Sequence, residues 1–419
     1  MRETMLSTPE GIRDVYGLEC ERKHACIASM ENVLHLYGYK DIETPTFEYF
    51  GIFNSDKGSA PSNEMYKFFD RDNNTLVLRP DFTPSVARCV AKYFNEEELP
   101  IRLCYKGKTF ASTKLHQGKL AEITQLGSEL INDDSSAADA ETIACVIDCL
   151  LASGLTKFQI EIGQVDFFKG ILEEAGLDED VEDKLRDYIQ IKNFFGLSEY
   201  ISSIDIPENV RDNLNNLSGL FGGVEVLDRA FSMTENSRAR EAVDRLRKVY
   251  TALSYYEYEK YISFDLSMIN GYDYYTGVVF SGYTYETGNP IVKGGRYNTL
   301  LKQFGKDAPS IGFSLYVDEL MNSLIRQEIP YENKKEAALI VYVIEHQDSA
   351  LRLAKKLRDK GVIAQLIRKS KRHDTEEYME YADRYNAGKV YILLDQKTVR
   401  IISADRSVDE ERSIESLDC

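Results

Sequence analysis

The stretch NGYDYYTG at residues 270–277 contains the residue types of a pocket for a small polar ligand. Phenol hydroxyls and a carboxylate hydrogen-bond polar groups, aromatic rings enclose the apolar part of a ligand, and glycines let a backbone approach closely. An apolar, alternating stretch follows at 278–283 and predicts a strand. Taken alone, these residues also fit a buried strand whose tyrosines only pack, so the pocket interpretation depends on the rest of the chain.

A second candidate segment, KGGRYNTLL at residues 293–301, places Arg296 directly after two glycines. It is not a phosphate-binding loop, because it lacks the Gly-Lys-Ser/Thr end that precedes a helix in such loops. Arg296 fits either a ligand contact or a structural ion pair, and the residues leave both open. The five histidines are scattered without metal-ligand spacing, so we expect no metal site and no cofactor.

The elements that position these segments are predicted to be strands and helices in mixed order. Residues 75–94 predict a strand, a turn and a helix, with Thr83 as the N-cap. Residues 135–154 place apolar side chains on one face of a helix that ends at Gly154. Residues 157–165 alternate between apolar and polar side chains, which predicts a half-buried strand.

The pattern changes twice along the chain. Residues from about 168 to 258 are acidic and helical without strand signals, which predicts a helical insertion, and strand signals return at 262–285. A charged linker at 326–336 precedes a compact unit at 337–419, where strands and helices alternate. We therefore expect a first domain at 1–325 and a small C-terminal α/β domain.

The composition excludes several classes of protein. The net charge of −18 disfavours nucleic-acid binding, since such proteins usually present a basic face to phosphates. No run approaches the roughly 20 apolar residues of a membrane helix, and the first residues lack the apolar core of a signal peptide. The seven cysteines form no CxxC pair and are expected to be reduced, buried thiols. These features together predict a cytoplasmic protein.

The order of these segments resembles histidyl-tRNA synthetase, a class II aminoacyl-tRNA synthetase, over essentially the whole chain. TPEGIRDVYG at 8–17 is similar to that family's N-terminal signature, and YGYKDIETPTFEYFGIF at 37–53 to its dimer-forming motif. VLRPDFTPSVAR at 77–88 resembles the segment that contacts the histidine amino group, while GYDYYTG and KGGRYNTLL resemble the two histidine-binding peptides. The resemblance implies an α+β fold with a class II synthetase-like antiparallel sheet core, the helical insertion, and a C-terminal unit like a shortened anticodon-binding domain.

The resemblance also implies which residues meet histidine. Asp81, where the family usually has Glu, and Thr83 match positions that meet the α-amino group, with Gln125 and Glu129 nearby on a central strand. Two tyrosines match the positions that enclose the imidazole ring. The candidate histidine-binding set is Asp81, Thr83, Gln125, Glu129, Asp273, Tyr274, Tyr275 and Arg296.

Amino-acid activation by this family needs arginines against the ATP α-phosphate, where negative charge develops during transfer. The three matching positions carry Ala111, Asn270 and Glu319 here, and the last of these reverses the charge. One lost donor of this kind costs roughly 10²–10³ in rate. We therefore predict negligible adenylation and no catalytic residues in this chain.

A synthetase-like chain without those arginines resembles the ATP phosphoribosyltransferase regulatory subunit family. The resemblance implies a non-catalytic subunit that activates a short catalytic ATP phosphoribosyltransferase in the first step of histidine biosynthesis. It further implies histidine feedback and a homodimer within a hetero-octamer. Two alternatives stay open, an active histidyl-tRNA synthetase and a synthetase-derived binding or sensor protein. The sequence also leaves open whether effector histidine binds the synthetase-like pocket or an interface between subunits.

Overall fold

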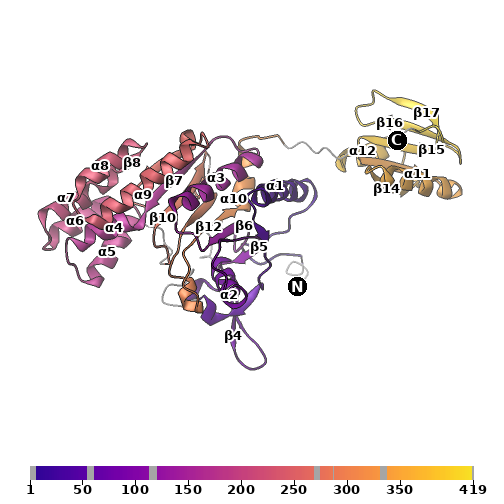
Figure 1. Ribbon diagram of the computed structural model, residues 1–419. Helices are drawn as coiled ribbons and strands as arrows, with labels where there is room; N and C mark the ends of the chain where they lie inside the picture. The colour runs from indigo at the N-terminus through magenta and orange to yellow at the C-terminus, as the bar shows by residue number, and fades with distance from the viewer. Residues whose placement is uncertain are drawn as a thin grey trace. The chain divides into compact units, whose positions relative to one another are not determined.

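The computed structural model describes residues 6–53, 61–112, 120–268, 274–285, 287–330 and 337–417. Contacts divide the chain into two compact units, Met1–Pro330 and Tyr331–Cys419 (Figure 1). The boundary lies inside the segment that the sequence assigns to a charged linker. No helix among the described residues has the length and apolar character needed to cross a membrane.

A nine-stranded sheet forms the centre of the first unit. Every neighbouring pair is antiparallel except β1/β5 and β7/β9. Antiparallel pairing places directly opposite side chains on the same face, so the register decides which residues meet. In spatial order the strands are β1 (Lys40–Asp41), β5 (Ile101–Phe110), β6 (Glu122–Ile131), β12 (Ser310–Tyr316), β11 (Val292–Arg296), β10 (Val278–Thr284), β7 (Phe158–Gln164), β9 (Ile262–Asp265) and β8 (Phe221–Gly222).

Helices cover the two faces of this sheet with separate apolar clusters. On one face, α1 (Gly17–Leu36), α3 (Ser136–Ala152) and α10 (Val317–Arg326) pack over β6 and β12. On the other face, α2 (Thr83–Tyr93) packs with aromatic side chains of the pocket described below. Because side chains alternate along each strand, β10 contributes Val278 and Phe280 to the first cluster and Val279 to the second.

The predicted helical insertion appears as a block of helices beside the β7 end of the sheet (Figure 1). The two-residue strand β8 pairs with β9 inside this region, a pairing too short to leave a sequence signal. The helices are α4 (Val165–Glu173), α5 (Glu179–Gln190), α6 (Phe194–Ser203), α7 (Glu208–Asn216), α8 (Glu225–Met233) and α9 (Ser237–Ser254).

The predicted N-terminal cap of α2 is wrong, whereas the predicted end of α3 is confirmed. Phe82 occupies the N-cap position of α2, and its backbone N–H donates to Asp81 Oδ1 at 2.7 Å. The Thr83 hydroxyl instead donates to Glu129 on β6, so a tertiary contact replaces the expected local one. Helix α3 ends at Ala152, and Gly154 follows with a left-handed φ of 92°.

A small antiparallel sheet extends the first unit, and short 3₁₀ turns connect the longer elements. Its strands are β2 (Phe47–Tyr49), β4 (Thr75–Leu78) and β3 (Lys67–Phe69), in that spatial order. The 3₁₀ turns are η2 (Phe50–Ile52), η3 (Ser62–Glu64), η4 (Leu217–Gly219), η5 (Glu259–Tyr261), η6 (Leu301–Phe304) and η7 (Ile344–His346).

The second unit is a five-stranded mixed sheet with apolar clusters on both faces. The three strands β14, β13 and β15 are parallel, and β16 and β17 continue the sheet antiparallel. The last strand, DEERS, has no apolar alternation and was not predicted. The elements are β13 (Ala337–Tyr342), α11 (Gln347–Asp359), β14 (Ile363–Arg368), α12 (Thr375–Arg384), β15 (Lys389–Leu393), β16 (Thr398–Ser403) and β17 (Asp409–Ser413).

Candidate ligand-binding site

Two glycines on adjacent strands make room for a pocket on the α2 face of the central sheet. Gly295 of β11 pairs with Gly312 of β12, which pairs with Glu129 of β6. A Cβ at Gly312 would lie 1.7 Å from Glu129 Oε2, and one at Gly295 would lie 2.7 Å from the Tyr275 ring. Glycine is therefore required at both positions for these side chains to occupy the space above the sheet.

The resulting cavity collects six of the eight predicted histidine-binding residues, from α2, β6 and the segment before β10. Its space between lining atoms amounts to about 320 Å³, but only about 20 Å³ of this is wide enough for a water molecule. Side chains thus fill most of the pocket, and a ligand must displace some of them. The lining residues are Asp81, Thr83, Gln125, Glu129, Tyr274, Tyr275, Lys293, Tyr297, Gly312, Phe313, Ser314 and Tyr316.

Glu129 lies at the centre of the pocket's hydrogen bonds. Its Oε1 accepts from the Thr83 hydroxyl at 2.8 Å and from Tyr105 Oη at 3.2 Å. Its Oε2 accepts from Tyr297 Oη at 2.5 Å. The side chain is 1% exposed, and none of the ion pairs found among the described residues includes it. This carboxylate is therefore surrounded by hydroxyl donors rather than by a cation.

Asp81 supplies a second buried carboxylate at the start of α2. Its Oδ1 accepts from the Phe82 N–H, and its Oδ2 accepts from Tyr274 Oη at 3.3 Å. Burial raises the pKa of Asp81, and it raises the pKa of Glu129 to about 8. Both groups are costly to ionise in the closed pocket, so a cationic ligand group beside them would be strongly favoured.

Gln125 adds a polar atom without a hydrogen-bond partner. Its side chain is 4% exposed, and its Oε1 is buried and accepts no hydrogen bond within the described part of the chain. A buried acceptor left unpaired costs roughly 1–3 kcal/mol. Because Gln125 lines the cavity, a ligand N–H donor is the natural partner for this oxygen.

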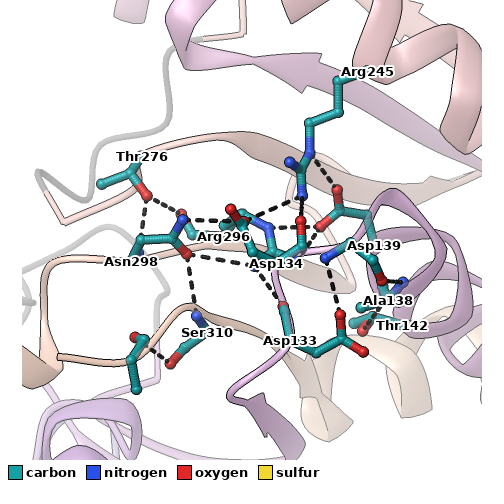
Figure 2. Close-up of polar contacts among 12 residues, drawn as sticks. Asp133, Asp134, Ala138, Asp139, Thr142, Arg245, Thr276, Arg296, Asn298 and Ser310 are labelled. Carbon is teal, nitrogen blue, oxygen red and sulfur yellow. Dashed lines mark hydrogen bonds and ion pairs between the residues drawn. The ribbon is translucent and has the colours of Figure 1, made fainter. Parts of the chain in front are cut away.

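Arg296 does not join the pocket, although it belongs to the same predicted set. It follows Gly295 on β11, and strand alternation turns its side chain to the opposite face of the sheet. There its Nε donates to Asp139 Oδ1 at 2.8 Å and its Nη1 donates to the Asp133 carbonyl at 2.9 Å (Figure 2). Arg245 of α9 donates to the other oxygen of Asp139 at 2.7 Å.

This ion-pair network joins β11, the start of α3 and the helical insertion. Asp139 is fully buried, and the Arg296 side chain is 2% exposed. Of the two interpretations that the sequence left open for Arg296, the observed contacts match the structural ion pair. The network also borders a second, larger cavity of about 540 Å³, in which acids and cations are mixed.

The three positions matched to phosphate-binding arginines lie outside the pocket lining or outside the described residues. The backbone N–H of Ala111 donates to the Ala121 carbonyl at 2.9 Å at the end of β5. Glu319 lies in the first turn of α10 and accepts from Asn289 at 3.2 Å. Asn270 and the predicted pocket residue Asp273 lie outside the described residues.

Although the sequence predicts no metal site, one cluster of possible metal ligands occurs among the described residues. The ligand atoms of His35, Asp41 and Cys104 lie within 4.8 Å of one another. Burial raises the pKa of the Cys104 thiol to about 12, aided by the neighbouring Asp41 carboxylate. A thiol must lose its proton to bind a metal, so this group is poorly prepared as a ligand.

Sequence reasoning missed several residues that build the pocket. Tyr105 lies on β5, far from any motif, and only the pairing of β5 with β6 brings it to Glu129. Tyr297 directly follows Arg296 in the KGGRY segment. Strand alternation predicts that these two side chains lie on opposite faces of the sheet, which could have placed Tyr297 in the pocket. Lys293 and Ser314 face the cavity from directly paired positions on β11 and β12.

Comparison with known proteins finds similarity to histidyl-tRNA synthetases and to ATP phosphoribosyltransferase regulatory subunits. The family model described as histidyl-tRNA synthetase matches residues 11–320. An ATP phosphoribosyltransferase regulatory subunit of Acetivibrio thermocellus is 35% identical over 417 residues, covering 100% of this chain and 99% of that protein. Another, from Clostridium acetobutylicum, is 39% identical over 318 residues, covering 75% of this chain and 78% of that protein.

Solved structures show the same fold. A structure from Bacillus halodurans, described as an ATP phosphoribosyltransferase regulatory subunit/histidyl-tRNA synthetase, has a TM-score of 0.84 at 32% identity and covers 93% of this chain and 98% of that one. A histidyl-tRNA synthetase from a Nostoc species has a TM-score of 0.82 at 18% identity, covering 98% and 97% of the two chains. The predicted α+β fold with a class II synthetase-like core is confirmed.

Proposed function

The chain belongs to the ATP phosphoribosyltransferase regulatory subunit family, and we propose that it binds a short catalytic ATP phosphoribosyltransferase and regulates it in response to histidine. In this proposal the chain activates its partner in the first step of histidine biosynthesis and performs no chemistry itself. The Glu129 pocket is proposed as the histidine site, and the partner holds all reacting groups.

The polar groups of the pocket support this proposal. Asp81 and Glu129 are buried carboxylates without a cation partner among the described residues, and they suit the α-ammonium group of an amino acid. Gln125 Oε1 is a buried acceptor without a donor among the described residues and suits an N–H of the ligand. Tyr274 and Tyr275 stand side by side, with ring centroids 4.9 Å apart, and offer aromatic surface to an imidazole.

A reconstituted complex tests this function. The full chain is mixed with a short catalytic ATP phosphoribosyltransferase, and formation of phosphoribosyl-ATP is followed with and without histidine. We expect co-elution of the two chains, a large gain in rate, and inhibition by histidine. The proposal is wrong if the two chains do not associate or if the added chain leaves the rate unchanged.

The location of the effector is tested separately, because an interface between subunits is the competing site. Histidine binding is measured by calorimetry on the chain alone and on the complex. Binding to the isolated chain, lost in Gln125→Ala, supports the pocket. Binding only to the complex, with the same affinity in Gln125→Ala, would place the effector at an interface.

An active histidyl-tRNA synthetase is the second candidate, because the matching family model and both solved structures described above carry that name. Activation requires cations at the ATP phosphates, and the matched positions carry Ala111, Asn270 and Glu319. We expect no histidine-dependent exchange between ATP and pyrophosphate. Robust exchange by the purified chain would establish the synthetase reaction instead.

The assembly is also part of the proposal. The segment 37–53 resembles a dimer-forming motif, and we expect a homodimer that joins catalytic subunits in a hetero-octamer. Mass measurement of the isolated chain and of the complex in solution checks both steps. A monomer, or a complex of one chain of each kind, would contradict this arrangement.

A further inference from the structure

Among the described residues that line the pocket, Lys293 is the one lysine or arginine, and the others include acids, an amide, hydroxyls and aromatic rings. It lies on β11 with Gly295, two residues apart, so strand alternation turns both toward the cavity. Lys293 precedes the two glycines and Arg296 in the KGGRY segment, and it is not among the candidate histidine-binding residues that the sequence indicates.

The register places Lys293 across the pocket from Glu129. Lys293 pairs with Ser314 of β12, and Glu129 pairs with Gly312, two residues earlier on the same strand. The two residues are thus separated by two strand spacings and one side-chain row, about 12 Å between Cα atoms for ordinary sheet geometry. The side chains enter the same cavity from different sides.

The residues that lie in one row with Lys293 across the sheet are small. Within its row it is flanked by Ser281 of β10 and Ser314 of β12, which are both short. The next residue along this row is Gly127 on β6, where a Cβ would lie 2.6 Å from the Tyr105 ring. A flexible lysine can therefore move its ammonium group over a floor of small residues.

An α-amino acid has opposite charges at its two polar ends, and this pocket has opposite charges at two of its sides. Asp81 and Glu129 suit the ammonium group, and Lys293 suits the carboxylate. These opposite charges orient the ligand, so that the side chain of the ligand contacts Tyr274, Tyr275 and Gln125. A carboxylate held as an ion pair is also a weaker nucleophile, which fits recognition of a free amino acid rather than its activation.

We propose that Lys293 is a specificity-determining residue that binds the free carboxylate of the amino-acid ligand. This inference rests on the proposed function, because it deepens the role of the same pocket. It requires that the ligand be a zwitterion, and it predicts rejection of analogues in which the carboxylate is replaced by a neutral group.

The test compares histidine with histidinol, in which a hydroxymethyl group replaces the carboxylate, by calorimetry on the full chain. A hydrogen bond to a charged group separates the two ligands by about 10–100-fold, so we expect the wild-type chain to prefer histidine by that factor. Lys293→Met should weaken histidine by a similar factor and leave histidinol within about threefold. Lys293→Arg should restore most of the preference.

Lys302→Met is the matched control, since Lys302 pairs with Asp307 at the surface and lies outside the pocket. It should change neither affinity. Equal affinity of the wild-type chain for both ligands overturns the role of Lys293 and leaves the proposed function intact. Equal weakening of both ligands in Lys293→Met, with no rescue by arginine, also overturns it. No histidine binding by the wild-type chain or its complex overturns the proposed function and this inference together.

Discussion

Two buried acids on opposite faces of the central sheet have opposite surroundings. Asp139 on the α3 face is held by the guanidinium groups of Arg296 and Arg245 (Figure 2). Glu129 on the α2 face is held by hydroxyl groups of Thr83, Tyr105 and Tyr297. A buried carboxylate with two cations is satisfied and stabilises the structure, whereas one with neutral donors alone retains affinity for a cation. The first carboxylate joins elements of the fold, and the second lies in the proposed histidine pocket.

The largest effect, on the free energy of unfolding, is expected from breaking the buried ion pair between Arg296 and Asp139. Arg296→Met leaves Asp139 buried with Arg245 as its remaining cation, and removal of one partner of a buried pair costs about 3–5 kcal/mol. Urea unfolding measures this loss. Arg186→Met, which removes a surface ion pair with Asp183, serves as the control and should shift the midpoint far less.

The same variant distinguishes the two alternative roles of Arg296, a structural ion pair and a ligand contact. Because its side chain lies on the face away from the pocket, Arg296→Met should change histidine affinity less than threefold in the folded fraction. A loss of about 100-fold without loss of stability would make Arg296 a ligand contact and contradict the comparison.

The next effect concerns Glu129, the buried acid that is held by hydroxyl groups. Glu129→Gln keeps the shape of the side chain but cannot ionise beside a ligand ammonium group, and we expect histidine to bind about 100-fold more weakly by calorimetry. Glu122→Gln on the same strand, where Glu122 pairs with Lys108 near the surface, should bind normally. Unchanged affinity in Glu129→Gln would remove this carboxylate from the ligand site.

A smaller effect is expected from adding a side chain at Gly312, beneath the pocket. Gly312→Ala places a Cβ 1.7 Å from Glu129 Oε2, so the carboxylate must move. We expect about tenfold weaker histidine binding and a loss of roughly 1–3 kcal/mol of stability from overpacking. Gly288→Ala, which meets no atom within 4 Å, is the control. Equal histidine affinity and equal stability of the two variants would show that position 312 tolerates a side chain.

The smallest effect concerns pH. The pKa of Glu129 is raised to about 8 in the folded chain, above the ordinary value of 4.5. The folded state therefore retains a proton that the unfolded state has lost, and stability falls as pH rises from about 4.5 to 8. Wild-type stability relative to Glu129→Gln should decrease across this range by on the order of 1 kcal/mol or more. Glu122→Gln should retain the wild-type slope, and parallel slopes for wild type and Glu129→Gln would contradict the prediction.

Most of the pocket was predictable because its residues lie in segments that resemble the histidine-binding segments of histidyl-tRNA synthetase. Asp81, Thr83, Gln125, Glu129, Tyr274 and Tyr275 were proposed together and line one cavity. Arg296 was included because it shares a segment with Gly295, yet one residue along a strand reverses the face. Thr83 was expected to cap α2, but its hydroxyl contacts Glu129, a residue distant in sequence.

The sequence by itself determined the order of strands and helices, the helical insertion and the segments that carry the pocket. These follow from short-range periodicity and from residue types within a few positions of one another. Only the tertiary structure decided that Tyr105 and Tyr297 contact Glu129, that Lys293 lines the same cavity, and that Arg296 contacts Asp139. The physical reason is that strand register brings together residues far apart in the chain, and a shift of one residue moves a side chain to the other face.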